Sequence, residues 1–131
     1  MRGERLARLV AGLGIGSIVF GIAPALAPRF FGRLFGLPVD AEPTVPTIVR
    51  SVGVRDALIG AGLWSAVTHR GNYLPWLLAR ALSDSGDTLA VALAVRAGAR
   101  NPRFLSLGAL ALGAAVSGVT LYWAAQSSRA S

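Results

Sequence analysis

The chain has 131 residues, of which 53% are hydrophobic and 15% are charged, and its mean hydropathy is +0.57. A soluble domain carries roughly 25% charged residues, so this composition leaves too few charges for a water-exposed surface and predicts an integral membrane protein. The absence of cysteine excludes disulfides and thiolate chemistry, and one histidine, His69, cannot form a metal site by itself. We therefore expect neither a metal nor another cofactor.

The net charge of +7 comes from 13 arginines, with no lysine. A protein that binds nucleic acid would be expected to carry its basic residues in one stripe. These arginines instead flank or interrupt hydrophobic segments. Basic residues gather in this way at the edges of membrane spans. The expected partner is the lipid bilayer, and the expected location is the cell membrane, crossed several times; in a bacterium this is the inner membrane.

The first predicted span covers residues 6–27 and contains an uncharged apolar segment of sufficient length to cross a bilayer. A secretory signal is the alternative, with residues 25–27 as the cleavage site, but Pro28 directly after that site disfavours cleavage. Gly12 and Gly16 form a small-xxx-small pair that favours close helix packing in lipid. The segment is therefore expected to be retained as a helix.

Residues 28–46 form the longest predicted connection, and their first part is amphipathic. Between positions 29 and 35, four apolar side chains share one helical face and two arginines share the other, a pattern typical of a short helix in the headgroup region. The apolar positions are Phe30, Phe31, Leu34 and Phe35, opposite Arg29 and Arg33. The remainder, which contains several prolines, is expected to be an irregular loop.

Three further spans are predicted at residues 47–68, 73–95 and 104–126. The short polar turn at 69–72 makes the first two of these antiparallel neighbours. In the last, Ala109, Gly113 and Ser117 form a second stripe of small residues. The predicted fold is therefore a single all-α domain over residues 1–131, a four-helix transmembrane bundle with one interfacial amphipathic helix. Orientation stays open because five arginines fall on each side, which also permits insertion in both directions.

The second and third predicted spans each carry three charged residues inside otherwise apolar sequence. The second carries Arg50, Arg55 and Asp56, and the third carries Arg80, Asp84 and Asp87. On a helical projection, Gly53 and Gly60 lie on one arc with Arg50 and Asp56, whereas Arg55 points away and requires a different partner or a route to the interface. The charged face of the third span also includes Tyr73, Trp76 and Ser83.

With a rise of about 1.5 Å per residue, antiparallel packing places Asp56, Asp84 and Asp87 within about 4 Å of one another in depth. Arg55 lies beside them, while Arg50 and Arg80 are expected towards opposite ends. An unpaired charge at the centre of a bilayer costs at least about 2.5–3.5 kcal/mol. The charges are therefore expected to meet as a neutral cluster of three arginines and three aspartates, beside glycines that leave room for a ligand.

This cluster is the candidate site. Two carboxyls close together in a medium of low dielectric do not both stay ionised without cationic partners, so one can hold a proton. The candidate acid–base residues are Asp56, Asp84 and Asp87. The candidate binding residues are Arg50, Gly53, Arg55, Tyr73, Trp76, Arg80 and Ser83.

The segment Arg50-Ser-Val-Gly53-Val-Arg55-Asp56, followed by Gly60, resembles an uncharacterised bacterial and fungal family of small membrane proteins, a domain of unknown function. Its pattern is R-x-x-G-x-R-D-x-x-x-G, with a further aspartate in the next span, matched here by Asp84 or Asp87. The resemblance extends over spans two to four and residues 30–38, and the first helix matches only in character. It implies a four-helix topology and says little about activity.

Three functions remain open at this stage. The first is cofactor-free acid–base catalysis, an isomerisation or cyclisation, on a lipophilic small molecule. The second is proton-coupled transport by a homo-oligomer, since the four helices of one copy are few to enclose a translocation path. The third is a structural or accessory membrane protein in which the charges fix only the assembly of the helices.

Overall fold

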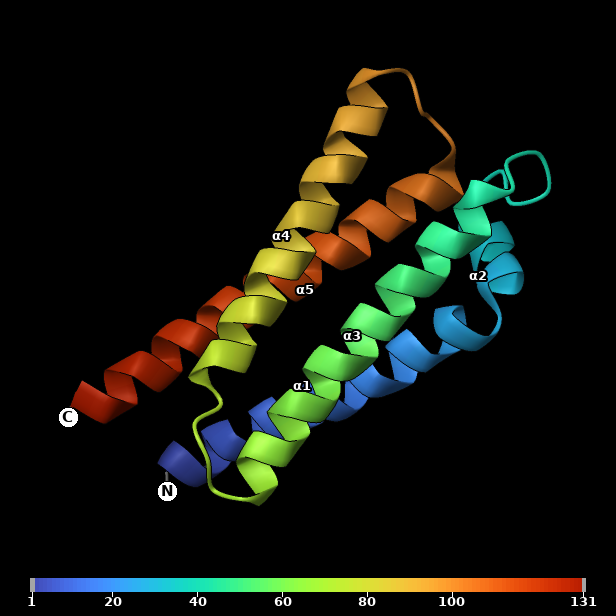
Figure 1. Ribbon diagram of the computed structural model, residues 1–131. Helices are drawn as coiled ribbons and strands as arrows, with labels where there is room; N and C mark the ends of the chain where they lie inside the picture. The colour runs from blue at the N-terminus through green and yellow to red at the C-terminus, as the bar shows by residue number, and fades with distance from the viewer. Residues whose placement is uncertain (1, 131) are drawn as a thin grey trace.

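The computed structural model describes residues 2–130, which form five helices and no strand (Figure 1). The prediction of an all-α chain is therefore confirmed; residues 1 and 131 of the predicted domain lie outside the described range. The helices are α1 (Arg2–Leu26), α2 (Pro28–Leu34), α3 (Thr44–Thr68), α4 (Leu74–Arg96) and α5 (Pro102–Ala130). An asparagine side chain shortly before each of the last two helices accepts a hydrogen bond from a backbone amide in the first turn. Asn72 Oδ1 accepts from the Leu74 amide at 3.1 Å, and Asn101 Oδ1 accepts from the Arg103 amide at 2.9 Å.

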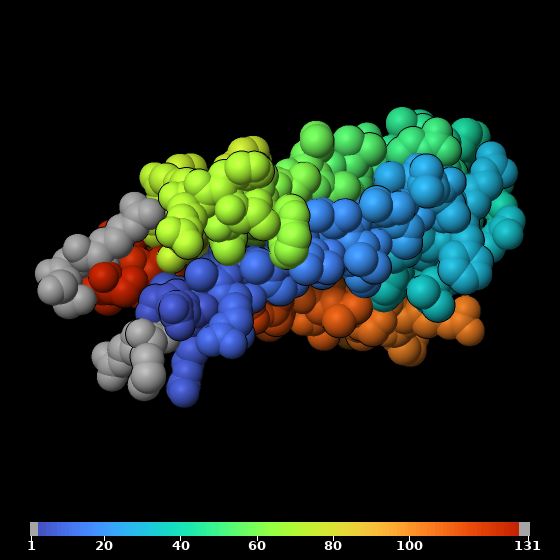
Figure 2. Space-filling model, turned by 90° about the horizontal axis from the view of Figure 1, so that it is seen from below, coloured from blue at the N-terminus to red at the C-terminus, as the bar shows by residue number. Residues whose placement is uncertain are grey.

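Helices α1 and α3 form a tightly packed antiparallel pair, and the space-filling view shows them side by side over their length (Figure 2). Glycines seven residues apart on each helix allow the backbones to touch. A Cβ at Gly53 would lie 2.5 Å from the carbonyl oxygen of Gly21, and a Cβ at Gly60 would lie 2.6 Å from that of Gly14. At these positions no side chain larger than a hydrogen atom fits without a shift of the backbone.

Two expectations from the sequence about the glycines of α1 and α3 are wrong. Gly12 and Gly16 do not pack against another helix: nothing lies within 4 Å of a Cβ built at either position. Conversely, Gly53 and Gly60 leave no room for a ligand, because α1 occupies the space beside them. The seven-residue spacing of Gly14 and Gly21, not the four-residue spacing of their neighbours, matches that of the α3 glycines.

Helices α4 and α5 form the second pair. Gly108 faces Val91, with 2.6 Å between a built Cβ and Val91 Cγ1, and Gly118 faces Ala81 at 3.3 Å from its Cα. The predicted packing stripe on the last helix does not form this contact. Its members, Ala109, Gly113 and Ser117, are all exposed, because they lie on the face of α5 turned away from α4.

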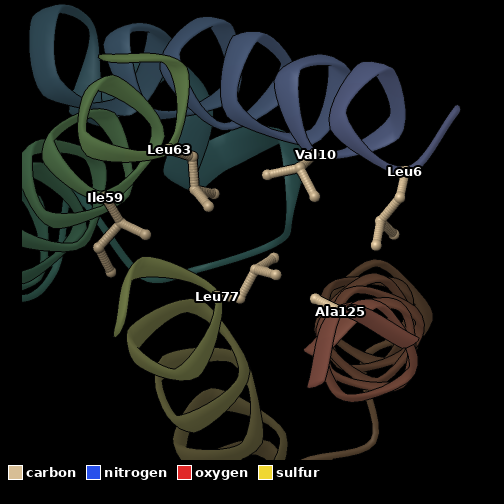
Figure 3. Packing of buried hydrophobic residues seen from close by; sticks show 6 residues of the cluster. All are labelled: Leu6, Val10, Ile59, Leu63, Leu77 and Ala125. Carbon is tan, nitrogen blue, oxygen red and sulfur yellow. The ribbon is translucent and has the colours of Figure 1, made fainter. Parts of the chain in front are cut away.

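The two pairs meet at the end of the molecule that holds both termini. An apolar cluster drawn from α1, α3, α4 and α5 joins them there (Figure 3). Its members are Leu6, Val10, Ile59, Leu63, Leu77 and Ala125. Beyond this junction α4 leans away from α3 towards its C-terminus (Figure 1), whereas the start of α5 stays close to α2, where Asn101 Nδ2 donates to the carbonyl oxygen of Gly36 at 3.5 Å.

The amphipathic pattern of α2 predicted that its four apolar side chains share one outward face. In the structure these side chains divide between the inside and the outside of the protein. Phe31 and Phe35 turn inwards and contact each other, with ring centroids 4.9 Å apart, and Phe31 also meets Phe20 edge-on. Phe30 and Leu34 remain exposed. Arg33 on the outer side donates two hydrogen bonds to Asp40. These bonds and the nearby positive charge hold the pKa of the Asp40 carboxyl below its usual value.

Two helices in the described range are long and apolar enough to cross a membrane, over Gly3–Leu26 and Pro102–Ser128. Only 28% and 11% of their most apolar windows are buried within the protein. The core helix of a soluble protein would be mostly buried, so this exposure favours helices in contact with lipid. Helices α3 and α4 differ from these two in that each carries charged residues in its middle.

Candidate functional site

Five charged side chains from α3 and α4 meet just beyond the apolar junction. Arg55 bridges the helices: its Nη2 lies 3.0 Å from Asp56 Oδ1 and 2.6 Å from Asp87 Oδ2. Arg80 holds Asp84 through two parallel hydrogen bonds, one of them 2.6 Å from Nε to Oδ2. Asp56, Arg80 and Asp84 are buried, with 5%, 7% and 2% of their surfaces exposed. These three charges therefore lie inside the protein, whereas the side chains of Arg55 and Asp87 are 35% and 33% exposed.

Asp56 lies at the centre of this charge cluster. Its Oδ1 accepts from Arg55 Nε at 3.1 Å and lies 3.4 Å from Arg80 Nη1, an ion-pair distance without the geometry of a hydrogen bond. Its Oδ2 has no hydrogen-bond partner among residues 2–130. Both oxygens of Asp84 and both of Asp87, in contrast, accept from an arginine. Asp56 is thus the carboxylate that keeps one oxygen uncommitted.

Arg50 does not join the cluster, contrary to the expectation of three arginines and three aspartates. It is exposed, and its Nε donates to the carbonyl oxygen of Ala25 at 3.1 Å, near the C-terminal end of α1. This contact satisfies one of the carbonyls left free where a helix ends. Two arginines and three aspartates remain, so the cluster has a formal charge of −1 when all of its groups are ionised.

Arg80 was expected towards one end of its span, near the membrane interface, but its guanidinium lies in the cluster. Its guanidinium contacts Asp84 on the next turn of α4 and approaches Asp56 on α3. An arginine side chain extends over more than one helical turn, so the position of its Cα does not fix the depth of its charge. Arg55, expected to point away from the cluster, likewise bends back to reach it.

A cavity of about 600 Å³ lies beside the cluster, between the two helix pairs. Four of the five charged residues line it, all except Arg55, and the rest of its wall is almost entirely apolar. The apolar lining comes from every helix and includes Leu13, Phe20, Phe31, Val52, Val91, Leu107, Leu110 and Ala114. Ligand sites commonly have volumes of about 300–1,000 Å³ and combine apolar walls with a few placed polar groups. This cavity has both properties.

Arg55 lies between this cavity and a second hollow of about 620 Å³ on the outer side of α3. It lines that hollow together with Arg50 and Trp76, and its guanidinium contacts two carboxylates of the inner cavity. With 35% of its side chain exposed, Arg55 is the most accessible member of the cluster. It therefore connects the outer hollow with two carboxylates that line the inner cavity.

Besides Arg50 and Arg55, four more candidate binding residues do not line the cavity. Gly53 contacts α1. Trp76 covers Gly62 of α3, and Tyr73 packs on the apolar junction. Ser83 is on the charged face of α4, but it does not line the cavity, and its Oγ is buried with no hydrogen-bond partner in the described part of the chain. These residues shape the helices around the site without forming its wall.

The contributions of α1, α2 and α5 to the site were missed from the sequence. Gly12 and Gly16, which the sequence pattern marked as packing residues, line the cavity, and so do Phe20 and Phe31. Their small and aromatic side chains gave no signal distinct from that of lipid-facing positions. On α5 the spacing of Leu107, Leu110 and Ala114 was a usable sign of one helical face, but only the packing of the helices shows what that face borders.

A family model described as "Domain of unknown function (DUF4267)" matches residues 14–125. No curated protein and no solved structure matches the chain. The matched range contains α2, α3 and α4 completely, about half of α1 and most of α5, together with all five residues of the charge cluster. The chain belongs to the family of the domain of unknown function DUF4267, which confirms the predicted membership of an uncharacterised domain family.

Proposed function

We propose that this protein is a four-span integral membrane protein of the cell membrane that binds a lipophilic small molecule in its central cavity and transfers protons on it. The reaction class is cofactor-free acid–base catalysis, such as an isomerisation or a cyclisation. The observation that carries the proposal is the cavity itself: it has the volume of a ligand site, and its walls are apolar except on one side, where three carboxylates and the Arg80 guanidinium line it.

In this proposal Asp56 is the group that exchanges the proton, because its Oδ2 is free of hydrogen bonds within the described residues. Arg80 and Arg55 hold Asp84 and Asp87 in place and stabilise negative charge that develops on the substrate. A buried, water-poor wall strengthens both effects, since the effective dielectric constant there is lower than in water. The apolar wall on α1, α2 and α5 selects a lipophilic substrate.

A four-span arrangement follows if α3 and α4 cross the bilayer beside α1 and α5, with their charges facing inwards. Ion pairing within the protein removes the main objection to placing charged residues at that depth. The remaining surfaces of α3 and α4 expose large apolar side chains, among them Leu58, Leu82 and Leu89. Such side chains suit contact with lipid tails.

Labelling of single cysteines tests the four-span arrangement, because the natural chain has no cysteine. With a membrane-impermeant maleimide on sealed vesicles, we expect Gly71→Cys and Ser127→Cys to react from one side. Ala41→Cys and Ala97→Cys should react from the other side. Leu58→Cys, on an exposed apolar face of α3, should react from neither. Efficient labelling at position 58 in the native protein would show that α3 faces water and would contradict the arrangement.

Hydrogen exchange tests the chemistry even when the substrate has not been identified. Wild-type protein in lipid nanodiscs is incubated in deuterated water with an organic extract of membranes from the source cells. Acid–base catalysis at carbon should place solvent deuterium in the substrate, which mass spectrometry detects as a mass increase of about 1 Da per exchanged site. Asp56→Asn should abolish that signal. Asp40→Asn, at the exposed ion pair with Arg33, is the matched control and should retain it.

Two outcomes of this experiment contradict the catalytic proposal. One is the absence of any deuterium incorporation that depends on the wild-type protein. The other is incorporation that persists at an undiminished rate in Asp56→Asn, which would assign the proton transfer to another group.

A further inference from the structure

The charges around the cavity do not balance, and this imbalance specifies the ligand further. Asp56, Asp84 and Asp87 carry three negative charges against the two positive charges of Arg55 and Arg80. Arg50, the other arginine of α3, is committed to the end of α1 and lies outside the cluster. A net charge of −1 in a buried, apolar setting costs several kcal/mol unless a counter-charge accompanies it.

The other helices supply no counter-charge. Among the described residues that line the cavity, α1, α2 and α5 contribute no titratable side chain, and α3 and α4 contribute only the members of the cluster. No group of described residues has the composition of a metal site. The counter-charge must therefore come from a proton or from a molecule in the cavity.

Asp56 provides the point at which such a molecule would bind. Its side chain is 8% exposed, it lines the cavity, and its Oδ2 is free of hydrogen bonds to the described residues. A cation there would also approach Asp87, whose side chain is 33% exposed and lines the same cavity. The apolar walls opposite exclude a small hydrated ion and favour an organic body around the charge.

We propose that the cavity binds a lipophilic organic molecule with a single positive charge, which takes the place of a proton held by the cluster in the ligand-free state. The exchange is balanced: the protonated cluster has no net charge, the cation enters, one proton leaves to water, and the occupied site is again neutral. This inference rests on the proposed ligand cavity and adds the charge of the ligand to it.

Matched probes of opposite charge test this inference. Tetraphenylphosphonium and tetraphenylborate have nearly the same size and shape, and triphenylphosphine oxide is a neutral relative. With wild-type protein in nanodiscs, and empty nanodiscs as the reference for partition into lipid, we expect saturable binding of tetraphenylphosphonium at one site. Tetraphenylborate should show no saturable binding. Cation binding should release a proton into weakly buffered solution and should weaken as the pH falls from 8 to 5.5.

Variants that change the charge of the cluster separate this inference from simple apolar binding. Asp56→Asn and Asp87→Asn each bring the formal charge from −1 to zero, and each should weaken tetraphenylphosphonium binding by at least about tenfold, the effect of losing one carboxylate partner at a few ångströms in a protein medium. Asp56→Glu keeps the charge and should retain binding. Asp40→Asn, outside the cavity, should bind as the wild type does. Thermal unfolding of each variant shows whether it is folded.

Several outcomes overturn the inference. Tetraphenylborate binding equal to that of tetraphenylphosphonium would do so, and so would cation binding that is unchanged in folded Asp56→Asn and Asp87→Asn. If triphenylphosphine oxide binds and the cation does not, the cavity proposal stands and the charge assignment is wrong. If none of the three probes binds, the charge assignment is also wrong, and the deuterium experiment alone decides the catalytic proposal.

Discussion

Replacing Arg80 with alanine should destabilise the protein by about 3–5 kcal/mol, the typical cost of removing one partner from a buried ion pair. The substitution leaves Asp84, which is 2% exposed, with no cation to accept from, and it removes one of the two arginines near Asp56. The measurement is the free energy of unfolding of the purified protein, from reversible denaturation in mixed micelles.

A double substitution distinguishes the loss of a partner from the loss of a useful interaction. Arg80→Met combined with Asp84→Leu removes both charges and fills their space with apolar atoms, which commonly restores stability. We expect the double variant to be more stable than Arg80→Ala. Arg33→Ala, at the exposed pair with Asp40, should leave unfolding unchanged because solvent screens such pairs. An Arg80→Ala variant as stable as the wild type would show that the pair is not buried in the native protein.

Gly53→Ala should cost about 1–3 kcal/mol, the range for overpacking a close contact. The added methyl group would lie 2.5 Å from the carbonyl oxygen of Gly21 and 2.6 Å from the amide nitrogen of Ala25, so the backbones of α1 and α3 must separate. Flexible side chains could move aside, but backbone atoms of a packed helix cannot. Thermal unfolding and the yield of monodisperse protein measure the effect.

Gly86→Ala is the matched control, since it makes the same chemical change in the middle of α4. Nothing lies within 4 Å of a Cβ at that position, so the only effect should be the better helix propensity of alanine, a gain of up to about 1 kcal/mol. Equal stability losses at positions 53 and 86 would mean that close contact between α1 and α3 does not hold the protein together.

The function proposed for the cavity depends on the same two features. Arg80 holds the carboxylates that line one side of the cavity. The glycine contact between α1 and α3 fixes the distance between these two helices, which both contribute to the cavity wall. A change in either should therefore alter ligand binding together with stability. Asp56→Asn should act differently, since it is nearly isosteric and removes only a charge. A loss of proton exchange or cation binding without a large loss of stability is the pattern expected of a functional residue.

The sequence by itself determined the elements of this protein. Long apolar segments separated by proline, glycine and asparagine predict helices with ends close to those observed, because local propensity and turn chemistry act over a few residues. The helical period also placed Asp56, Asp84 and Asp87 on faces able to meet, since it depends only on positions along one helix. Membership of an uncharacterised family was likewise predicted from the sequence, and the family model over residues 14–125 shows it.

Only the tertiary structure decided which partners these residues have. Arginine side chains are long and flexible, so the sequence could not show that Arg50 leaves the cluster for the carbonyl of Ala25 while Arg55 and Arg80 enter it. Nor could it distinguish the glycines that touch a neighbouring backbone from Gly12 and Gly16, which border the cavity. Both outcomes depend on the crossing of helices distant in sequence. For this reason the fold class was predictable from local pattern, whereas the unbalanced charge beside the cavity was not.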